Sequence, residues 1–420
     1  MKSNKKKLAI LILFALIAGC GGGSGSSGGS GSGGGSGVVS SPTMTGSNVV
    51  PITVNGSLCL SNSYVNEPCV SITICNPGTS TCQVIHGILL DTGSYGLRIF
   101  KSVLNSNISL TQVTSGSNPL AECVEYGGGT FQWGPVQLAG VILASEPTVT
   151  VPVQVIDSTF FGSIATSSTS TICPNAEQGP TETGFNGILG VGLFNQDCGT
   201  GCVSNANNGW YYSCSGSSCT GSVAALTDQV QNPVVSLPTD SNGLMVQLPS
   251  ITSGGATAAN GNLVLGIGTQ TNNVPSGVTA YPANLSAEFI TTVTGTTHAY
   301  RSSFIDSGSN GLFFNPISAS QASLLPTSCT STGWFCPSTI QNLSATNTGS
   351  TGSPSDLVSF QIANITQLNA GNNAFNDIGA TIVPPADTFD WGLPFFYGKN
   401  VWIGIEGQTS TLGIGPYWAY

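Results

Sequence analysis

Two aspartates, Asp91 and Asp306, lie in closely similar sequence segments, and this repeated segment is the strongest candidate for a catalytic site. Residues 88–97 read Ile-Leu-Leu-Asp-Thr-Gly-Ser-Tyr-Gly-Leu, and residues 303–312 read Ser-Phe-Ile-Asp-Ser-Gly-Ser-Asn-Gly-Leu. The carboxylates of Asp91 and Asp306 thus each follow apolar residues and enter a turn, where backbone N–H groups and hydroxyls can hold them. If the two turns meet, the carboxylates cannot both ionise, so one serves as a base and the other as an acid. A water molecule between them becomes a nucleophile.

Short strands must position these two turns, because the sequence is rich in β-like segments with Gly, Asn, Ser or Pro at their ends. The clearest lie at 71–74, 87–90, 148–156, 262–265 and 401–405. Helical periodicity is scarce, and short helices are expected only at 222–229 and 317–325. Since the aspartate segment occurs once in each half, the sequence predicts an all-β protein with two related lobes, 50–235 and 236–420.

Ordinary turn chemistry is the alternative explanation of the two aspartate segments, since Asp, Gly and Ser are common turn residues. Against it, the Asp, Gly, Ser, Gly and Leu positions of the two segments match in register. Apolar residues also precede both aspartates. The repeat therefore favours a shared site over two unrelated turns.

The N-terminus has the pattern of an export signal. Basic residues at 1–7 precede a continuous apolar run at 8–18, which is short for a membrane span. The run ends in Leu-Ile-Ala-Gly-Cys, which resembles the bacterial lipobox, so residues 1–19 are expected to be removed and Cys20 to carry lipid. Residues 20–49 begin with a Gly/Ser-rich stretch that is typical of a flexible tether. The expected location is the bacterial cell envelope, anchored by lipid to the outer membrane.

Charge limits the partners. Only 6% of the residues are charged, and four of the eight basic residues lie in the expected signal. The remaining four basic residues face 18 acidic ones, a formal charge of −14. Such a surface does not attract nucleic acid, because binding phosphates requires clustered Lys and Arg.

Cysteine usage agrees with an exported protein. Of the 13 cysteines, Cys20 is assigned to lipid, which leaves an even number for disulfides. The simplest pairing joins sequence neighbours, namely 59 with 69, 75 with 82, 198 with 202, 214 with 219 and 329 with 336, and leaves 123 and 173. A metal site is the alternative, but the two histidines, His86 and His298, belong to no paired Cys/His spacing. Disulfides, and no metal, are expected.

The two aspartate segments resemble those of the pepsin-like aspartic proteases. Other segments that resemble this family follow in its order: a flap hairpin at 125–130, the strand after the flap at 136–140, apolar-Gly segments at 185–190 and 391–396, and an early strand of the second lobe at 261–266. The resemblance covers roughly residues 50–420. It implies an all-β, bilobal pepsin-like fold with two pseudo-twofold-related lobes and few short helices.

The resemblance also implies residue roles. Asp91 and Asp306 correspond to the catalytic pair. The residues expected around the pair and its substrate are Thr92, Gly93, Ser94, Ser307, Gly308 and Ser309 in the two turns, with Tyr126, Gly127 and Arg98 at the flap. The implied reaction is water attack on a peptide bond in an extended polypeptide substrate, with no cofactor, no metal and no covalent intermediate. A monomer is expected.

Three departures from the family pattern leave a second function open. Arg98 stands where the family has Trp, and Asp390 replaces an apolar residue before Trp391. Residues 21–50 hold no Lys or Arg and so offer no basic propeptide. One hypothesis is therefore a membrane-anchored aspartic endopeptidase. The other is a non-catalytic envelope lipoprotein of the same fold that binds peptide or glycan between the lobes.

Overall fold

The computed structural model describes residues 37–162, 164–166, 170–382 and 387–420. Within them the protein is all-β with three short α-helices, as the sequence predicts. The signal at 1–19 and the lipid site at Cys20 lie outside the described residues. Among those described, no helix is long and apolar enough to cross a membrane.

Strands follow one another along the whole described chain. Those before residue 222 are β1 (Val39–Ser40), β2 (Val49–Val54), β3 (Pro68–Cys75), β4 (Cys82–Asp91), β5 (Tyr95–Phe100), β6 (Thr111–Gln112), β7 (Thr114–Ser115), β8 (Asn118–Glu125), β9 (Phe131–Ile142), β10 (Val149–Ile156), β11 (Gly187–Val191), β12 (Tyr211–Ser215) and β13 (Ser218–Gly221). The later ones are β14 (Gly243–Gln247), β15 (Ala259–Leu265), β16 (Ala280–Pro282), β17 (Phe289–Val293), β18 (Tyr300–Ile305), β19 (Leu312–Phe314), β20 (Gln341–Thr348), β21 (Ser355–Ile362), β22 (Gly379–Ala380), β23 (Thr388–Trp391), β24 (Asn400–Gly404), β25 (Thr409–Ser410), β26 (Gly413–Ile414) and β27 (Tyr417–Ala419). The helices are α1 (Pro180–Thr183), α2 (Thr200–Ser204) and α3 (Ala319–Leu324), with 3₁₀ turns η1 (Lys101–Val103), η2 (Pro233–Ser236), η3 (Ile365–Gln367) and η4 (Leu393–Phe395).

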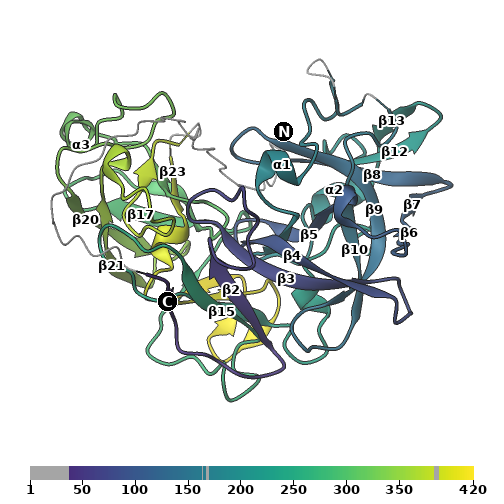
Figure 1. The fold of residues 1–420 in the computed structure, drawn as a ribbon, viewed down its shortest axis with the longest axis horizontal. Helices are drawn as coiled ribbons and strands as arrows, with labels where there is room; N and C mark the ends of the chain where they lie inside the picture. The colour runs from purple at the N-terminus through teal and green to yellow at the C-terminus, as the bar shows by residue number, and fades with distance from the viewer. Residues whose placement is uncertain (1–36, 163, 167–169, 383–386) are drawn as a thin grey trace, which may run out of the picture.

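Six strands of the first half close into a barrel. Each pairs with the next in the order β3, β4, β11, β5, β10 and β9, and β9 returns to β3. Closure leaves no unpaired strand edge. The strand β11 is buried along its length, and a Cβ at Gly187 would stand 2.3 Å from the carbonyl oxygen of Arg98, so only glycine fits there. The barrel lies on the right in Figure 1.

An open seven-stranded sheet, on the left in Figure 1, holds most of the second half in the order β21, β20, β17, β18, β23, β19 and β22. Its last four strands repeat the barrel's pairing. The strands that lead to the aspartates, β4 and β18, pair in parallel with β11 and β23 respectively. These pair antiparallel with the strands after the aspartate turns, β5 and β19. The strands β5 and β19 then pair in parallel with β10 and β22. The sequence repeat is therefore also a repeat of topology.

A third group of strands joins the two halves. Its order is β2, β15, β14, β24, β27 and β16, so it combines an early strand with central and C-terminal ones. Figure 1 shows β2 and β15 below and between the other two sheets. The folded body begins before residue 50, because β1 pairs with β15 at Val39 and Ser40. Asn48 is buried and donates to the Leu265 carbonyl, so the Gly/Ser-rich stretch ends before these contacts begin.

Of the two expected helices, one is present. The helix expected at 317–325 is confirmed as α3, where the Ser318 hydroxyl accepts the Gln321 N–H and caps the helix. The helix expected at 222–229 is wrong, because that segment consists of turns and irregular chain. There the Gln229 side chain bonds to the backbone of Gly199 and Ala224. These contacts take the place of a helical ladder.

The expected disulfides are confirmed. Six bonds join Cys59 to Cys69, Cys75 to Cys82, Cys123 to Cys173, Cys198 to Cys202, Cys214 to Cys219, and Cys329 to Cys336. The two cysteines left over by neighbour pairing thus bond to each other. One described cluster, Cys59, Glu67 and Cys69, has ligand-type atoms close together, but both of its sulfurs belong to a disulfide and offer no thiolate.

Candidate functional site

The two aspartate turns meet, and each carboxylate is held in the same way. Asp91 ends β4, and its Oδ1 accepts the Gly93 N–H at 2.8 Å. Asp306 follows β18, and its Oδ1 accepts the Gly308 N–H at 2.7 Å. In each turn the second carboxylate oxygen bonds to the serine hydroxyl three residues after the aspartate, Ser94 or Ser309. The repeated sequence motif therefore forms the same pair of hydrogen bonds in both turns.

Hydroxyls from each turn reach across to the other. The Thr92 Oγ1 donates to the Ile305 carbonyl at 2.9 Å, and the Ser307 Oγ donates to the Leu90 carbonyl at 2.7 Å. Each hydroxyl also accepts the other residue's backbone N–H, at 2.9 and 3.1 Å. All four bonds are buried, so they fix the relative position of the two strands that carry the aspartates.

Glycine is required where the turns touch. A Cβ at Gly93 would stand 2.5 Å from the carboxyl carbon of Asp306, which no real Cβ contact allows. The Asp91 and Asp306 carboxyl groups lie close enough for each to shift the pKa of the other. The sequence thus correctly predicts that Asp91 and Asp306 come together.

Electrostatics favour one proton shared by this pair. Burial raises the pKa of Asp91, while hydrogen bonds from Asp306, Ser94 and the Gly93 N–H oppose that rise. Burial also raises the pKa of Asp306 well above the ordinary aspartate value, and the charges of Asp91 and Asp390 raise it further. The buried pair therefore holds one proton between its two carboxyls, and the pKa of Asp306 is the one raised well above its usual range.

A third carboxyl group, Asp390 of β23, belongs to the site. Its Oδ2 lies 2.6 Å from the Ser309 Oγ, which is 2.9 Å from Asp306 Oδ2. A serine hydroxyl carries one hydrogen and cannot donate to both, so one of these two carboxyls must be protonated. Burial raises the pKa of Asp390 well above its usual range. Sequence analysis noticed Asp390 only as a departure from an apolar pattern, although an acid inside a buried strand was itself the signal.

Tyr126 and Gly127 lie in the turn between β8 and β9, as expected for a hairpin. The Tyr126 N–H donates to the Thr130 carbonyl, which closes the turn. The Tyr126 side chain is buried, and its hydroxyl donates to Gln132 Oε1 at 2.9 Å. Gln132 in turn donates to Glu177, whose pKa burial raises to about 7. No sequence motif indicates this series of hydrogen bonds, because Gln132 and Glu177 belong to none.

The guanidinium group of Arg98 lies in a buried ion cluster. Its Nη2 lies 2.9 Å from Glu122 Oε1 and 2.7 Å from Asp197 Oδ2, and its Nη1 donates to the Tyr95 carbonyl. All four residues are buried. Arg98 thus has a structural role beside two buried acids. It also lies close enough to the flap residue Tyr126 that its charge opposes the rise that burial causes in the pKa of the Tyr126 hydroxyl.

Residues 60–66, between β2 and β3, form a segment beside the aspartate turns, and we call this segment the cover. Neither Asp91 nor Asp306 has exposed surface. Tyr64 lies close enough to both that their charges, after burial and Glu67, raise the pKa of its hydroxyl. The sequence offered one signal for this cover, the closely spaced Cys59 and Cys69 on either side of it.

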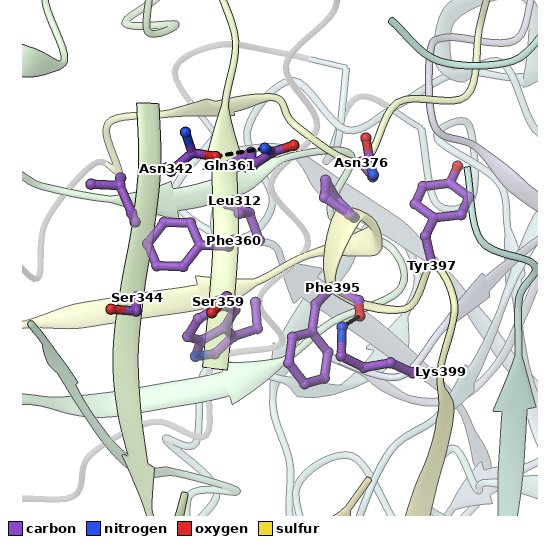
Figure 2. Close-up of a pocket in the computed structure, with 13 residues that line it drawn as sticks. Leu312, Asn342, Ser344, Ser359, Phe360, Gln361, Asn376, Phe395, Tyr397 and Lys399 are labelled. Atoms are coloured by element: carbon purple, nitrogen blue, oxygen red, sulfur yellow. Dashed lines mark hydrogen bonds between the residues drawn. The ribbon is translucent and has the colours of Figure 1, made fainter. Parts of the chain in front are cut away.

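A separate pocket of about 620 Å³ opens in the second half, where β20 and β21 face η4. Figure 2 shows its mixed lining of aromatic and amide side chains, among them Phe360, Phe395, Asn342 and Gln361. Neither aspartate of the pair lines it. Tyr397 connects it to the cover, because this pocket-lining residue donates from its hydroxyl to Asn66 Oδ1 at 3.0 Å.

Comparison with known proteins places the chain in a family. Residues 44–420 match the family described as Protein of unknown function (DUF3443). The chain belongs to this family. The match begins between β1 and β2 and includes every later strand that the structure describes, with both aspartate turns and the cover. A search of curated proteins gives no match.

Proposed function

We propose that this DUF3443 protein is an aspartic endopeptidase with a bilobal, pepsin-like fold. The observation that carries the proposal is the carboxyl pair of Asp91 and Asp306, set in two turns whose hydroxyls bond reciprocally. Turn chemistry alone gives no reason for two turns from distant strands to interlock around two neighbouring carboxyls. The repeated strand pairing supports two related lobes on the same grounds.

The chemistry follows from the shared proton. The Asp91 carboxylate takes a proton from water, whose oxygen attacks the peptide carbonyl carbon, while Asp306 donates its proton to the carbonyl oxygen. The resulting gem-diol loses a hydroxyl proton to Asp306, and its C–N bond breaks. The electron pair goes to nitrogen, which takes the proton held by Asp91. One water and one peptide bond become a carboxylic acid and an amine, and both aspartates return to their starting state.

The cell-envelope setting is part of the proposal. Lipid on Cys20 would hold the body at the outer membrane, with the Gly/Ser-rich stretch as spacer, and the substrate would be an envelope or secreted polypeptide. The protein would act as a monomer without a cofactor.

The test is cleavage of an unfolded, carboxymethylated protein at mildly acidic pH. We expect slow cleavage by the purified protein and a loss of at least about 100-fold in Asp91→Asn and Asp306→Asn, because each substitution removes one member of an acid–base pair. Asp228→Asn is the matched control, since Asp228 is partly exposed and lies outside both aspartate turns. Equal cleavage by Asp91→Asn and the control would rule the mechanism out.

A second function is favoured by the closed state of the pair. Because both aspartates are covered and the pocket of Figure 2 is open, the protein can bind a ligand without catalysis. Aromatic rings beside amide groups suit a glycan or a peptide backbone. Tight binding of an oligosaccharide or peptide that is unchanged by Asp306→Asn, together with no cleavage, would favour this alternative.

A further inference from the structure

The cover at residues 60–66 touches both halves of the molecule. Tyr64 packs against a buried cluster of the first half that includes Tyr126, and Val65 packs against a cluster of the second half that includes Phe313. The Asn62 side chain donates to the Pro180 carbonyl of α1 at 3.0 Å. Figure 1 shows the chain after β2 between the barrel and the seven-stranded sheet. Two adjacent side chains thus pack against opposite halves of the molecule.

Asn66 anchors the end of the cover to the second half. Its amide donates to the carbonyls of Asn310 and Phe375 at 2.9 and 2.8 Å. Its Oδ1 accepts the Phe375 N–H at 2.7 Å and the Tyr397 hydroxyl at 3.0 Å. Asn310 belongs to the turn that carries Asp306, so this anchor is attached directly to the site. The backbone φ of Asn66 is +59°, in the left-handed region that few non-glycine residues adopt.

The closed arrangement leaves polar groups of the site unpaired. Among the described residues, neither the buried hydroxyl of Tyr64 nor the amide nitrogen and oxygen of Asn310 has a hydrogen-bond partner. Each buried, unpaired polar group opposes the closed state, because in an open state it can bond to water or to a peptide backbone. The cover is therefore held by the four bonds of Asn66, by the bonds from Asn62 to Pro180 and from Asn55 to the Tyr64 carbonyl, and by apolar contacts, against the cost of these unpaired groups.

Movement of the cover can stay local. The Cys59–Cys69 disulfide ties the two ends of the loop to the body. Ser61 and Asn62 are exposed, whereas the chain is buried from Asn66 onward into β3. Residues 60–66 can therefore move away from the aspartate turns while the strands and the turns keep their positions.

We propose that residues 60–66 are an autoinhibitory cover, which occupies the place of an extended peptide over Asp91 and Asp306 and must leave before substrate binds. This inference rests on the function proposed above for the pair. Regulation then depends on how easily the anchor at Asn66 is released.

Carboxyl labelling measures opening without relying on catalysis. The purified protein is treated with a water-soluble carbodiimide and glycine ethyl ester, and labelled sites are located by mass spectrometry. Asn66→Gly removes the four side-chain bonds but tolerates the positive φ. We expect labelling of Asp91 and Asp306 to rise at least about tenfold, since each bond lost shifts the closed–open equilibrium by a few-fold.

Two controls separate opening from unfolding. Ser61→Ala changes an exposed cover residue and should label like the wild type. Asp197 is buried in the Arg98 cluster and should stay unlabelled in every folded variant. If Asn66→Gly unfolds, as labelling of Asp197 would reveal, Tyr64→Ala carries the test, because it removes the ring and keeps the Asn66 anchor. If Asp91 and Asp306 are labelled no more in the folded variant than in the wild type, the proposal that residues 60–66 are an autoinhibitory cover is wrong.

Cleavage assays on the same samples distinguish this inference from the proposed function. Increased labelling with increased cleavage supports both. Increased labelling with no cleavage keeps the cover as a physical device and rejects the endopeptidase. Wild-type cleavage as fast as that of Asn66→Gly keeps the endopeptidase and rejects autoinhibition.

Discussion

The Ser309 hydroxyl gives the site a chemistry that a simple pair of aspartates would lack. The Ser309 hydroxyl contacts both Asp306 and Asp390, which brings a third carboxyl group into the site. Because the hydroxyl has one hydrogen, it can donate to only one of these two groups. Asp390 Oδ1 is buried without a partner among the described residues, which suits a protonated acid better than a carboxylate. Asp390 is thus a positioning residue that acts on Asp306 through Ser309.

Asp390→Leu should move the pH dependence of cleavage. At the pH where Asp390 ionises, its charge raises the pKa of Asp306, so removing Asp390 lowers the pH at which the pair loses its shared proton. The alkaline limb of the kcat/KM profile should shift to lower pH, and Asp390→Asn, whose amide can still donate to Ser309, should shift it less. Infrared spectra at neutral pH should also show less absorption from protonated carboxyls in Asp390→Leu. An unchanged profile together with an unchanged spectrum would contradict the role given to Asp390.

At the scale of elements, β5 and η1 carry two cations in opposite settings. Arg98 of β5 is buried between Glu122 and Asp197, whereas Lys101 of η1 is 65% exposed beside Asp157. Removing a buried partner leaves charges in a low-dielectric interior, while a surface pair is screened by water. The two cations thus differ in what they contribute to folding.

Arg98→Met should lower the free energy of unfolding by about 3–5 kcal/mol, because it leaves the buried acids Glu122 and Asp197 without the cation that binds both. Lys101→Met should cost at most about 1 kcal/mol. Urea denaturation with the disulfides intact measures both. Restoring the aromatic residue of the pepsin-like pattern with Arg98→Trp should be similarly destabilising for the same reason. A loss for Arg98→Met no greater than for Lys101→Met would show that the buried cluster is not held by its charges.

How far the sequence predicted these elements depended on the range of the contacts. The aspartate turns were predictable because the motif that builds each of them is local and occurs twice. The disulfides between neighbouring cysteines were predictable because their partners are at most 10 residues apart. The helix expected at 222–229 failed because bonds from Gln229 to a distant turn replaced it. The cover could not be foreseen, since Asn66 bonds to Phe375, a residue 309 positions away.

Across the whole molecule, buried acids bind protons more tightly when the protein is folded. Burial raises the pKa of Glu67 to about 8 and that of Glu177 to about 7, and it also raises the pKa values of Asp91, Asp306, Asp390 and Asp377. Asp157, whose pKa is lowered by hydrogen bonds and by Lys101, acts in the opposite direction. The balance favours a protein suited to acid conditions.

The free energy of unfolding should therefore be highest near pH 4 and should fall as the pH rises to 8. A raised folded-state pKa gives stability that is complete below the unfolded-state pKa, about 4, and is lost as the pH passes the folded value. Thermal unfolding across this range measures the effect. Glu67→Gln should flatten the decline between about pH 5 and 8, because Gln does not titrate. Higher stability at pH 8 than at pH 4 would contradict this assignment.

The most direct test of the central claim compares two opened proteins, Asn66→Gly and Asn66→Gly with Asp306→Asn. Both expose the site in the same way, so a difference between them reports the carboxyl pair alone. At mildly acidic pH we predict that Asn66→Gly cleaves an unfolded protein and that the double variant is slower by at least about 100-fold. Equal rates in the two, or no cleavage by an Asn66→Gly protein whose aspartates are shown to be labelled, would contradict the account.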